Sequence, residues 1–325
     1  MNKLIKYFNP YKIEENWLIK IYKFESKSFK FKISRYLRYG ISLLFKRLTF
    51  ELVAKRIEMP VNAQYKDIPF TARSTNSQFH SIYFEYYEDC YEPDIFATID
   101  LFLPLNGVFV DIGSNWGHHS FIAALEKGAK VYSFEPNSSV YDDLKSISYS
   151  LGCDHLVTPF NMACGSSNGL IELTQLGFES GVASISKDSI SKRSSSRHRI
   201  EKLINFITLK KTIREKVNVR KLDDVVNPDI KVDLIKIDVE GAEMQCLFGA
   251  LSIIKRCRPK IIFELRTDEF ANSKEFSDFF EALKYSLYIV EPNVSAKECK
   301  FREFGKLQPL AQYNILASFE KLEVS

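Results

Sequence analysis

From residue 106 onward, short apolar segments alternate with segments of helical periodicity, and this alternation limits the possible folds more than any other feature of the chain. Strands that alternate with helices of about 10–15 residues are typical of a parallel sheet covered by helices on both faces. The expected strands cover residues 107–113, 130–136, 157–164, 171–174, 233–239, 260–265, 288–290 and 313–319, and the expected helices cover residues 118–127, 138–150, 243–256 and 273–285. We therefore predict an α/β fold with a doubly wound, mostly parallel sheet and right-handed crossovers.

The composition excludes several other classes of protein. The chain has 325 residues, of which 45% are hydrophobic and 26% charged, and these values argue against a disordered, collagenous or disulfide-stapled chain. No apolar run approaches the roughly 18 residues that span a bilayer, and the N-terminus lacks the apolar region of a signal peptide. The six cysteines form no C-x-x-C pair and match no zinc spacing. We therefore expect reduced thiols and a cytoplasmic location.

Positive charge is concentrated at the N-terminus. Residues 1–56 contain 14 Lys and Arg against 4 Asp and Glu, a net charge of +10, whereas the remaining residues carry a net charge of −6. Such asymmetry suggests a polyanion or an anionic membrane surface as a partner. Apolar residues between Leu37 and Val53 recur at helical spacing. This pattern predicts either a helix that lies on anionic lipid or a helix packed on the main domain with solvated lysines.

We expect two regions in the chain. Residues 1–100 form a basic, helical and aromatic-rich N-terminal region, and residues 101–325 form the main domain, with a basic insertion at 186–216. The insertion has ten Lys and Arg against three acidic residues, and Phe206 is its only aromatic residue. Binding of nucleic acid, for which basic segments are often used, is therefore less favoured here than a solvated loop.

The strongest local signal is the segment Asp111-Ile-Gly-Ser-Asn-Trp-Gly117, which follows an apolar strand and precedes a helix. Glycines at such a turn let the backbone approach a ligand closely, and the start of the helix offers free N–H groups. A dinucleotide-binding loop would read G-x-G-x-x-G, but this loop reads G-x-x-x-G after an acidic residue. Asp111 would repel a diphosphate and would suit the ammonium of an amino acid, directly or through water. The loop therefore favours S-adenosylmethionine over NAD.

Acidic residues follow two further strands. Glu135 ends the strand after the glycine loop, where an acid can accept hydrogen bonds from both hydroxyls of a ribose, so it favours an adenosine ligand without choosing between NAD and S-adenosylmethionine. Asp238 and Glu240 follow a later strand, and ligands of open α/β sheets bind at this edge. An isolated acid at a strand end is often a helix cap, so the order of these features along the chain carries the prediction.

Together these segments resemble the FkbM-type family of S-adenosylmethionine-dependent methyltransferases. The resemblance runs from Tyr91-Glu-Pro93 to Phe263-Glu-Leu265 and includes V-D-I-G-S-N-W-G-H-H-S at 110–120, F-E-P-N at 134–137, A-C-G-S-S-N-G at 163–169 and K-I-D-V-E-G-A-E-M at 236–244. It implies a Rossmann-like class I methyltransferase fold. It also implies O-methylation, commonly of a hydroxyl in a sugar, a glycan or a secondary metabolite.

The resemblance also implies roles for individual residues. The residues expected to bind the cofactor are Asp111, Gly113, Asn115 and Gly117 in the glycine loop, Glu135 at the ribose, and Met162 and Ala163 at the adenine. The methyl acceptor is expected over Asp238, Glu240 and Glu264.

Methyl transfer to a sugar hydroxyl also needs a base. The candidates are Asp238, His118 and His119. Histidine has the more suitable unperturbed pKa, but both histidines can equally be residues of the helix start that pack on the cofactor, and we favour Asp238. A divalent cation held by Asp238 and Glu264 is the alternative role for these carboxylates. A nicotinamide-dependent oxidoreductase and a non-catalytic module of methyltransferase fold remain open as other functions.

Overall fold

The computed structural model describes residues 11–13, 60–73, 92–176, 183–184, 212–239, 241–266, 270–293, 298–303 and 312–322. These residues fall into two compact units. One unit consists of residues 92–171 and the described residues after 215, and the other of the described residues in 9–91 and 172–215. The helix expected between Leu37 and Val53, most of the basic insertion at 186–216, and Glu240 lie outside the described residues. The division of the chain at residue 100 remains a prediction.

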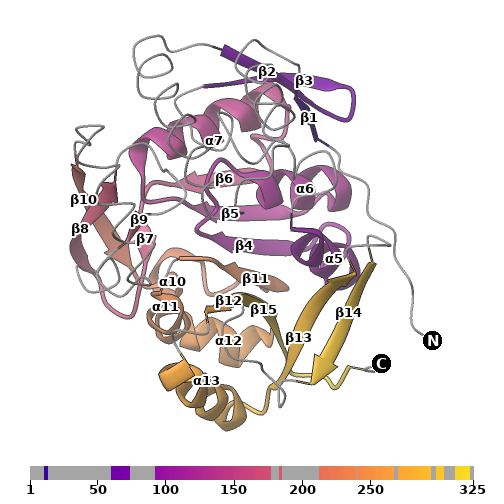
Figure 1. The fold of residues 1–325 in the computed structure, drawn as a ribbon, viewed down its shortest axis with the longest axis vertical. Coiled ribbons are helices and arrows are strands. Elements are labelled where there is room, and N and C mark those ends of the chain that lie inside the picture. Colours follow the sequence, from indigo (N-terminus) through magenta and orange to yellow (C-terminus); the bar gives the residue numbers. More distant parts are fainter. Residues whose placement is uncertain are drawn as a thin grey trace, which may run out of the picture. The chain divides into compact units, whose positions relative to one another are not determined.

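In the described part of the first unit, eight strands form one sheet in the spatial order β14-β13-β15-β12-β11-β4-β5-β6 (Figure 1). The strands are β4 (Val108–Ile112), β5 (Lys130–Phe134), β6 (Val157–Phe160), β11 (Leu234–Ile237), β12 (Lys260–Arg266), β13 (Ser286–Asn293), β14 (Glu298–Glu303) and β15 (Gln312–Ser318). The five strands from β12 to β6 in this order run parallel. Beyond β12, each of the neighbouring pairs β12–β15, β15–β13 and β13–β14 is antiparallel. The prediction of a doubly wound, mostly parallel sheet is therefore confirmed.

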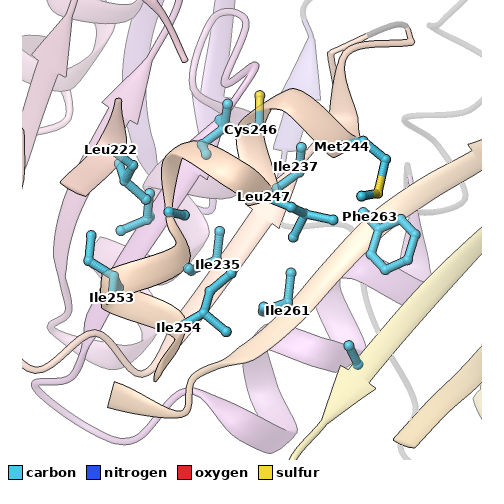
Figure 2. Packing of buried hydrophobic residues seen from close by; sticks show 14 of the residues in the cluster. Leu222, Ile235, Ile237, Met244, Cys246, Leu247, Ile253, Ile254, Ile261 and Phe263 are labelled. Carbon is cyan, nitrogen blue, oxygen red and sulfur yellow. The ribbon is translucent and has the colours of Figure 1, made fainter. Parts of the chain in front are cut away.

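Helices bury the faces of this sheet. They are α5 (Pro93–Phe102), α6 (His118–Lys127), α7 (Ser138–Ser150), α10 (Leu222–Val225), α11 (Glu243–Gly249), α12 (Leu251–Cys257) and α13 (Phe270–Ala282). Helix α6 contacts β4 and β5, and α7 contacts β6. Ile235 and Ile237 of β11 and Ile261 of β12 belong to a core cluster with Leu247 and Ile254 of α11 and α12 (Figure 2). Every residue of β11 is buried, as expected for a central parallel strand.

Two predicted elements are divided in the structure by polar side chains. The strand expected at 157–164 ends at Phe160, and β7 (Ala163–Cys164) pairs with β10 (Thr212–Arg220) instead. Between them, the Asn161 side chain donates hydrogen bonds to the backbone oxygens of Glu135 and Pro136, each at 3.0 Å. The helix expected at 243–256 breaks between α11 and α12, where the Asp223 carboxylate accepts the N–H groups of Ser252 and Ile253.

Some elements have no counterpart among the sequence-based predictions. Helix α5, the hairpin of β2 (Pro60–Tyr65) and β3 (Ile68–Arg73), and strand β14 are not among the expected strands and helices. In the second unit, β1 (Tyr11–Ile13) pairs antiparallel with β2, and β8 (Gly169–Leu176) pairs with β9 (Ala183–Ser184). Within the part of the chain that the structure describes, no helix combines the length and apolar character of a membrane span.

Candidate active site

The candidate site lies where the order of the strands reverses. From β4 the chain continues to β5 and β6 on one side, whereas β11 and β12 occupy the other side. Strands β4 and β11 are neighbours in parallel register, although more than 100 residues separate them in sequence. Open α/β sheets bind ligands outside the carboxyl ends of their strands at such a switch point. The structure therefore brings the glycine loop after β4, Glu135 after β5 and Asp238 after β11 to one edge of the sheet.

The glycine loop after β4 has a tightly constrained backbone. Its residues Gly113, Asn115 and Gly117 all have positive φ, at 76°, 51° and 97°. The N–H groups of Gly113 and Ser114 both donate to the backbone oxygen of Phe134, each at 3.0 Å. A Cβ atom at Gly113 would lie far inside van der Waals contact with the backbone oxygen of Asp238. Glycine is therefore required at position 113 because the loop backbone lies close to the end of β11.

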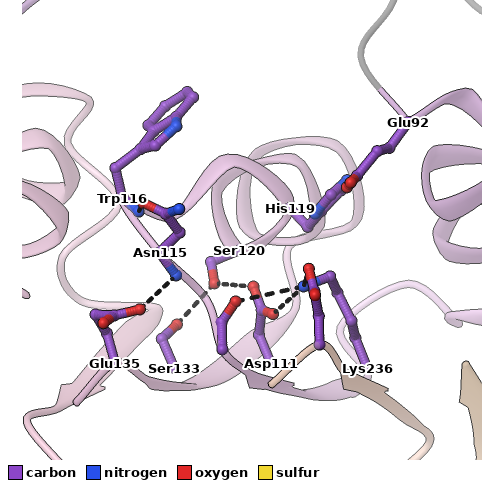
Figure 3. Close-up of polar contacts among 11 residues, drawn as sticks. Glu92, Asp111, Asn115, Trp116, His119, Ser120, Ser133, Glu135 and Lys236 are labelled. Atoms are coloured by element: carbon purple, nitrogen blue, oxygen red, sulfur yellow. Dashed lines mark hydrogen bonds and ion pairs between the residues drawn. The ribbon is translucent and has the colours of Figure 1, made fainter. Parts of the chain in front are cut away.

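Glu135 joins the glycine loop to the start of α7. Its Oε2 accepts the N–H of Asn115 at 3.0 Å (Figure 3), and its Oε1 accepts the N–H of Asn137 at 2.8 Å. The side chain of Asn115 in turn accepts the N–H of Trp116, which suits an asparagine in the left-handed region. Glu135 is only 7% exposed. Burial raises its pKa from 4.5 to about 7, although the two N–H donors oppose this shift.

The polar groups at this edge fit the adenosine part of a cofactor. Each oxygen of a carboxylate can accept more than one hydrogen bond, so Glu135 can still accept from two ribose hydroxyls while it holds both backbone N–H groups. In the glycine loop, the Ser114 hydroxyl is buried and has no hydrogen-bond partner among the described residues. Buried polar groups are normally hydrogen-bonded, so this hydroxyl is a further candidate contact for a polar ligand.

A buried charge cluster joins β4 to β11. The Lys236 ammonium lies 3.5 Å from Asp111 Oδ1 and 3.1 Å from Asp238 Oδ2, and it donates to the backbone oxygen of Gly113 at 3.4 Å. The other oxygen of Asp111 accepts the Ser120 hydroxyl at 2.7 Å (Figure 3). Contact between Asp111 and a ligand remains a prediction, because this carboxylate is fully buried and occupied by these two side chains.

The charge states of this cluster follow from its burial and its excess of carboxylates. Burial disfavours the charged form of Lys236, but the neighbouring Asp238 and Asp111 carboxylates outweigh burial and raise its pKa. Burial also raises the pKa of Asp111, against the opposing effects of Lys236 and Ser120. The lysine therefore remains an ammonium in the folded protein. Lys236 is not among the residues expected at the site, although a lysine inside an otherwise apolar strand signals a buried partner.

His118 and His119 begin α6, and both are buried. Their rings pack edge to face, and the ring of His118 also contacts Trp116. Nε2 of His119 lies 3.4 Å from Oε2 of Glu92, the residue before α5 (Figure 3). Burial lowers the pKa of His119 well below 6.5, and the charges of His118 and Lys236 act in the same direction. His119 is therefore neutral and a weak base.

The carboxylates expected on the acceptor side lie on neighbouring strands. Ile237 of β11 is in register with Phe263 of β12, so Asp238 and Glu264 each come one residue later on adjacent parallel strands. The side chain of Asp238 is 35% exposed, and Glu264 is half-buried. Among the described residues, no group of three or more His, Cys, Asp or Glu side chains is placed to hold a metal ion.

The residues expected at the adenine follow β6. Met162 is half-buried and packs against the core cluster, and Ala163 is buried in β7. The preceding Asn161 contacts the backbone of Glu135. This contact places Met162 and Ala163 next to the end of β5, where Glu135 is proposed to bind the ribose.

The sequence matches the family model of the FkbM methyltransferase domain over residues 111–302. None of the curated proteins compared with the chain matches it. Among solved structures, the FkbM methyltransferase of Methylobacillus flagellatus KT is 12% identical with a TM-score of 0.42, and the alignment covers 86% of this chain and 60% of that chain, less than two thirds of its length. An S-adenosylmethionine-dependent O-methyltransferase of Thermotoga maritima is 11% identical with a TM-score of 0.36, over 72% of this chain and 68% of that one. The family match extends over more than half of the chain and includes the glycine loop, Glu135 and Asp238.

Proposed function

The chain belongs to the FkbM methyltransferase family, and on this premise we propose that it transfers a methyl group from S-adenosylmethionine to a hydroxyl oxygen of a sugar, a glycan or a secondary metabolite. The observation that carries the proposal is the position of Glu135. Its carboxylate is fixed beside the glycine loop by two backbone N–H groups and still has room to accept from two ribose hydroxyls.

The residues that hold the cofactor come from the ends of three consecutive strands. Glu135 accepts hydrogen bonds from the ribose, the loop from Gly113 to Gly117 lies along the methionine part, and Met162 and Ala163 lie against the adenine. Asp111 attracts the ammonium of the methionine part through water, because its carboxylate is enclosed by protein. When bound, S-adenosylmethionine supplies a methyl group that its sulfonium already activates.

Asp238 is the favoured base for the acceptor hydroxyl. Its Oδ2 is held by Lys236 at 3.1 Å, and its side chain is partly exposed at the ligand-binding edge. His118 and His119 are both buried, and the lowered pKa of His119 makes it a poor proton acceptor. The Asp238 carboxylate would take the proton of the acceptor hydroxyl, and the bound cofactor would supply the methyl group by cleavage of its S–CH3 bond, leaving S-adenosylhomocysteine. In-line alignment of the reacting atoms contributes most of the rate.

The acceptor enters over Asp238, Glu240 and Glu264. Asp238 follows β11, and Glu264 lies in the neighbouring parallel strand β12. Carboxylates commonly accept hydrogen bonds from hydroxyl groups. The excess of positive charge in residues 1–56 supports peripheral contact with an anionic membrane, and we place the protein in the cytoplasm. Nucleic acid is not the expected partner.

Two measurements separate this function from its alternatives. Calorimetric titration with S-adenosylhomocysteine should show binding that S-adenosylmethionine competes and NAD does not, which would reject the nicotinamide-dependent oxidoreductase. Isotope transfer from methyl-labelled S-adenosylmethionine should then be screened against nucleotide sugars, oligosaccharides and lipid-linked glycans. A labelled product whose methyl group is bound to oxygen supports the proposal. Binding without transfer to any of these acceptors would favour the non-catalytic module.

A further inference from the structure

We infer that Lys236 is a positioning residue for the proposed methyl transfer: its ammonium fixes the glycine loop and the Asp238 carboxylate relative to one another. The inference rests on the proposed function, because the proposed function assigns the glycine loop to the cofactor and Asp238 to the acceptor. Lys236 lies on β11, whereas Gly113 follows the neighbouring strand β4.

Three oxygen atoms surround the ammonium group of Lys236. Its nitrogen lies within 3.5 Å of Asp111 Oδ1, Asp238 Oδ2 and the backbone oxygen of Gly113. An ammonium has three N–H donors, so the three oxygens match its donors in number. The side chain is almost fully buried. Lys236 can therefore act on a ligand only through the residues that it holds.

The link extends to two further elements, because Asp111 is bonded to Ser120, and Ser120 in turn contacts Ser133. Its Oδ2 accepts the hydroxyl of Ser120 in α6 at 2.7 Å, and that hydroxyl lies 2.8 Å from the hydroxyl of Ser133 in β5 (Figure 3). A continuous polar chain thus runs from β5 through α6 and β4 to β11. The two serine hydroxyls and Asp111 Oδ2 are joined by hydrogen bonds, and Asp111 Oδ1 joins Lys236 through an ion pair, so the chain favours one arrangement of these four elements.

The two groups that Lys236 holds lie just beyond the regular strands. Gly113 is the first residue after β4 and Asp238 the first after β11. Their backbone N–H groups still donate, to Phe134 and Ile112 respectively, but the carboxylate of Asp238 and the carbonyl of Gly113 depend on the ammonium. Without it, the Asp238 side chain can rotate away from the acceptor, and the loop can shift along the methionine part of the cofactor.

A purely structural role would be to neutralise the buried charge of Asp111, and a double variant separates the two roles. K236M leaves Asp111 buried without its partner, so this variant should melt well below the wild type. D111N/K236M removes both charges and should recover most of the lost melting temperature. D111N alone keeps Lys236 and measures the loss due to the Asp111 carboxylate, against which the double variant is compared. K231M, which removes an exposed lysine paired with Asp233 at the approach to β11, is the matched control.

The expected result is recovered stability without recovered turnover. For D111N/K236M we expect kcat to fall about 100-fold, as misplacement of reacting groups by about 1 Å can cause, while the Kd for S-adenosylhomocysteine rises less than about tenfold. In the unliganded protein, hydrogen exchange of residues 113–117 should accelerate in D111N/K236M and stay unchanged in K231M.

The outcomes distinguish this inference from the proposed function. If D111N/K236M is folded and has the wild-type kcat and loop exchange, Lys236 only neutralises Asp111 and the inference is overturned, while the proposed function stands. If the wild type neither binds S-adenosylhomocysteine nor transfers a methyl group, the proposed function fails and the inference fails with it.

Discussion

The carboxylate of Glu135 accepts the backbone N–H of Asn115 at 3.0 Å across the ends of β4 and β5. The same side chain accepts the N–H of Asn137 at the start of α7. One carboxylate thus sets the distance between the glycine loop and the helix after β5. A ligand that donates hydrogen bonds to Glu135 therefore also contacts a group on which the conformation of the loop depends.

We expect Glu135→Gln to weaken binding of S-adenosylhomocysteine. The amide presents an N–H₂ group to a backbone N–H or to a ribose hydroxyl, so at least one charge-assisted hydrogen bond is lost. The loss should be about 1.5–3 kcal/mol, or roughly 10- to 100-fold in Kd, by calorimetric titration. Asp154→Asn, which neutralises an exposed carboxylate, is the control and should leave Kd unchanged. An unchanged Kd in Glu135→Gln would contradict the ribose assignment.

The raised pKa of Glu135 predicts that cofactor binding depends on pH. The pKa of Glu135 is raised to about 7 by burial, and ribose hydroxyls donate to the ionised carboxylate. Binding therefore lowers this pKa and releases a proton when the pH is below about 7. Kd should be flat above about pH 8 and should rise by up to about tenfold per pH unit below about pH 7. Titrations between pH 5.5 and about 8.5 check this, and the slope should vanish in Glu135→Gln.

Glu135 should affect the stability of the unliganded protein in the opposite direction: its contribution to the free energy of unfolding should fall with rising pH, whereas cofactor affinity should rise. In the unfolded chain Glu135 has its ordinary pKa of 4.5, and in the folded protein a pKa of about 7. The folded state therefore binds more protons between these values, and the contribution of Glu135 to stability falls as the pH rises from about 4.5 to about 7. Denaturant unfolding of the wild type and Glu135→Gln should differ in pH dependence over this range. Parallel curves would show that the carboxyl titrates normally.

Gly113→Ala should destabilise the fold strongly. The new Cβ would collide with the backbone oxygen of Asp238, and φ is +76°. Gly152→Ala is the matched control, because Gly152 has φ of +68° and nothing within 4 Å of the added carbon. The control should lose only about 1–2 kcal/mol, the cost of the left-handed backbone, and Gly113→Ala clearly more. Equal losses in denaturant unfolding would show that β11 can move away from the loop.

Much of the fold could be predicted because the decisive signals are local. Helices α6 and α7 have the predicted bounds, since apolar periodicity and the residues at their ends mark both. The alternation of strands and helices also predicts that Gly113, Glu135 and Asp238 meet at one edge, because parallel strands end at the same edge of a sheet.

What the sequence could not predict depends on contacts between distant residues. The break between α11 and α12 involves Asp223, a side chain from another helix. The partners of Lys236 lie on β4 and in the loop after it, more than 100 residues away in sequence. Periodicity says that a lysine at this position is buried, but it does not say which carboxylate neutralises it.

Helix α7 begins at a side-chain cap. The Asn137 side chain accepts the N–H groups of Ser139 and Val140. Asn137→Ala should therefore cost about 0.5–2 kcal/mol in the free energy of unfolding. Ser150→Ala, at the exposed end of the same helix, should cost clearly less. A smaller loss in Asn137→Ala than in Ser150→Ala would rule out this cap.

The last prediction concerns the acceptor side of the site. Asp238→Asn keeps the shape of the side chain and an oxygen for Lys236, but the amide cannot take a proton. If Asp238 is the general base, kcat should fall by about 10²–10⁴-fold, while the affinity for S-adenosylhomocysteine stays within a few-fold, because the proposed cofactor contacts lie on β4, β5 and β6. Initial rates at saturating cofactor and calorimetric titration measure the two quantities.

Two controls are needed to interpret the kcat of Asp238→Asn. Asp154→Asn should have the wild-type kcat, since its carboxylate is exposed and precedes β6, whereas the site residue Met162 follows the other end of that strand. If Asp238 and Glu264 instead hold a divalent cation, activity of the wild type should vanish with a chelator and return with Mg²⁺. A near-normal kcat in Asp238→Asn would reject both chemical roles. Proton transfer would then have to involve His118 or His119, and opening of the buried ring contact between them would become a required step.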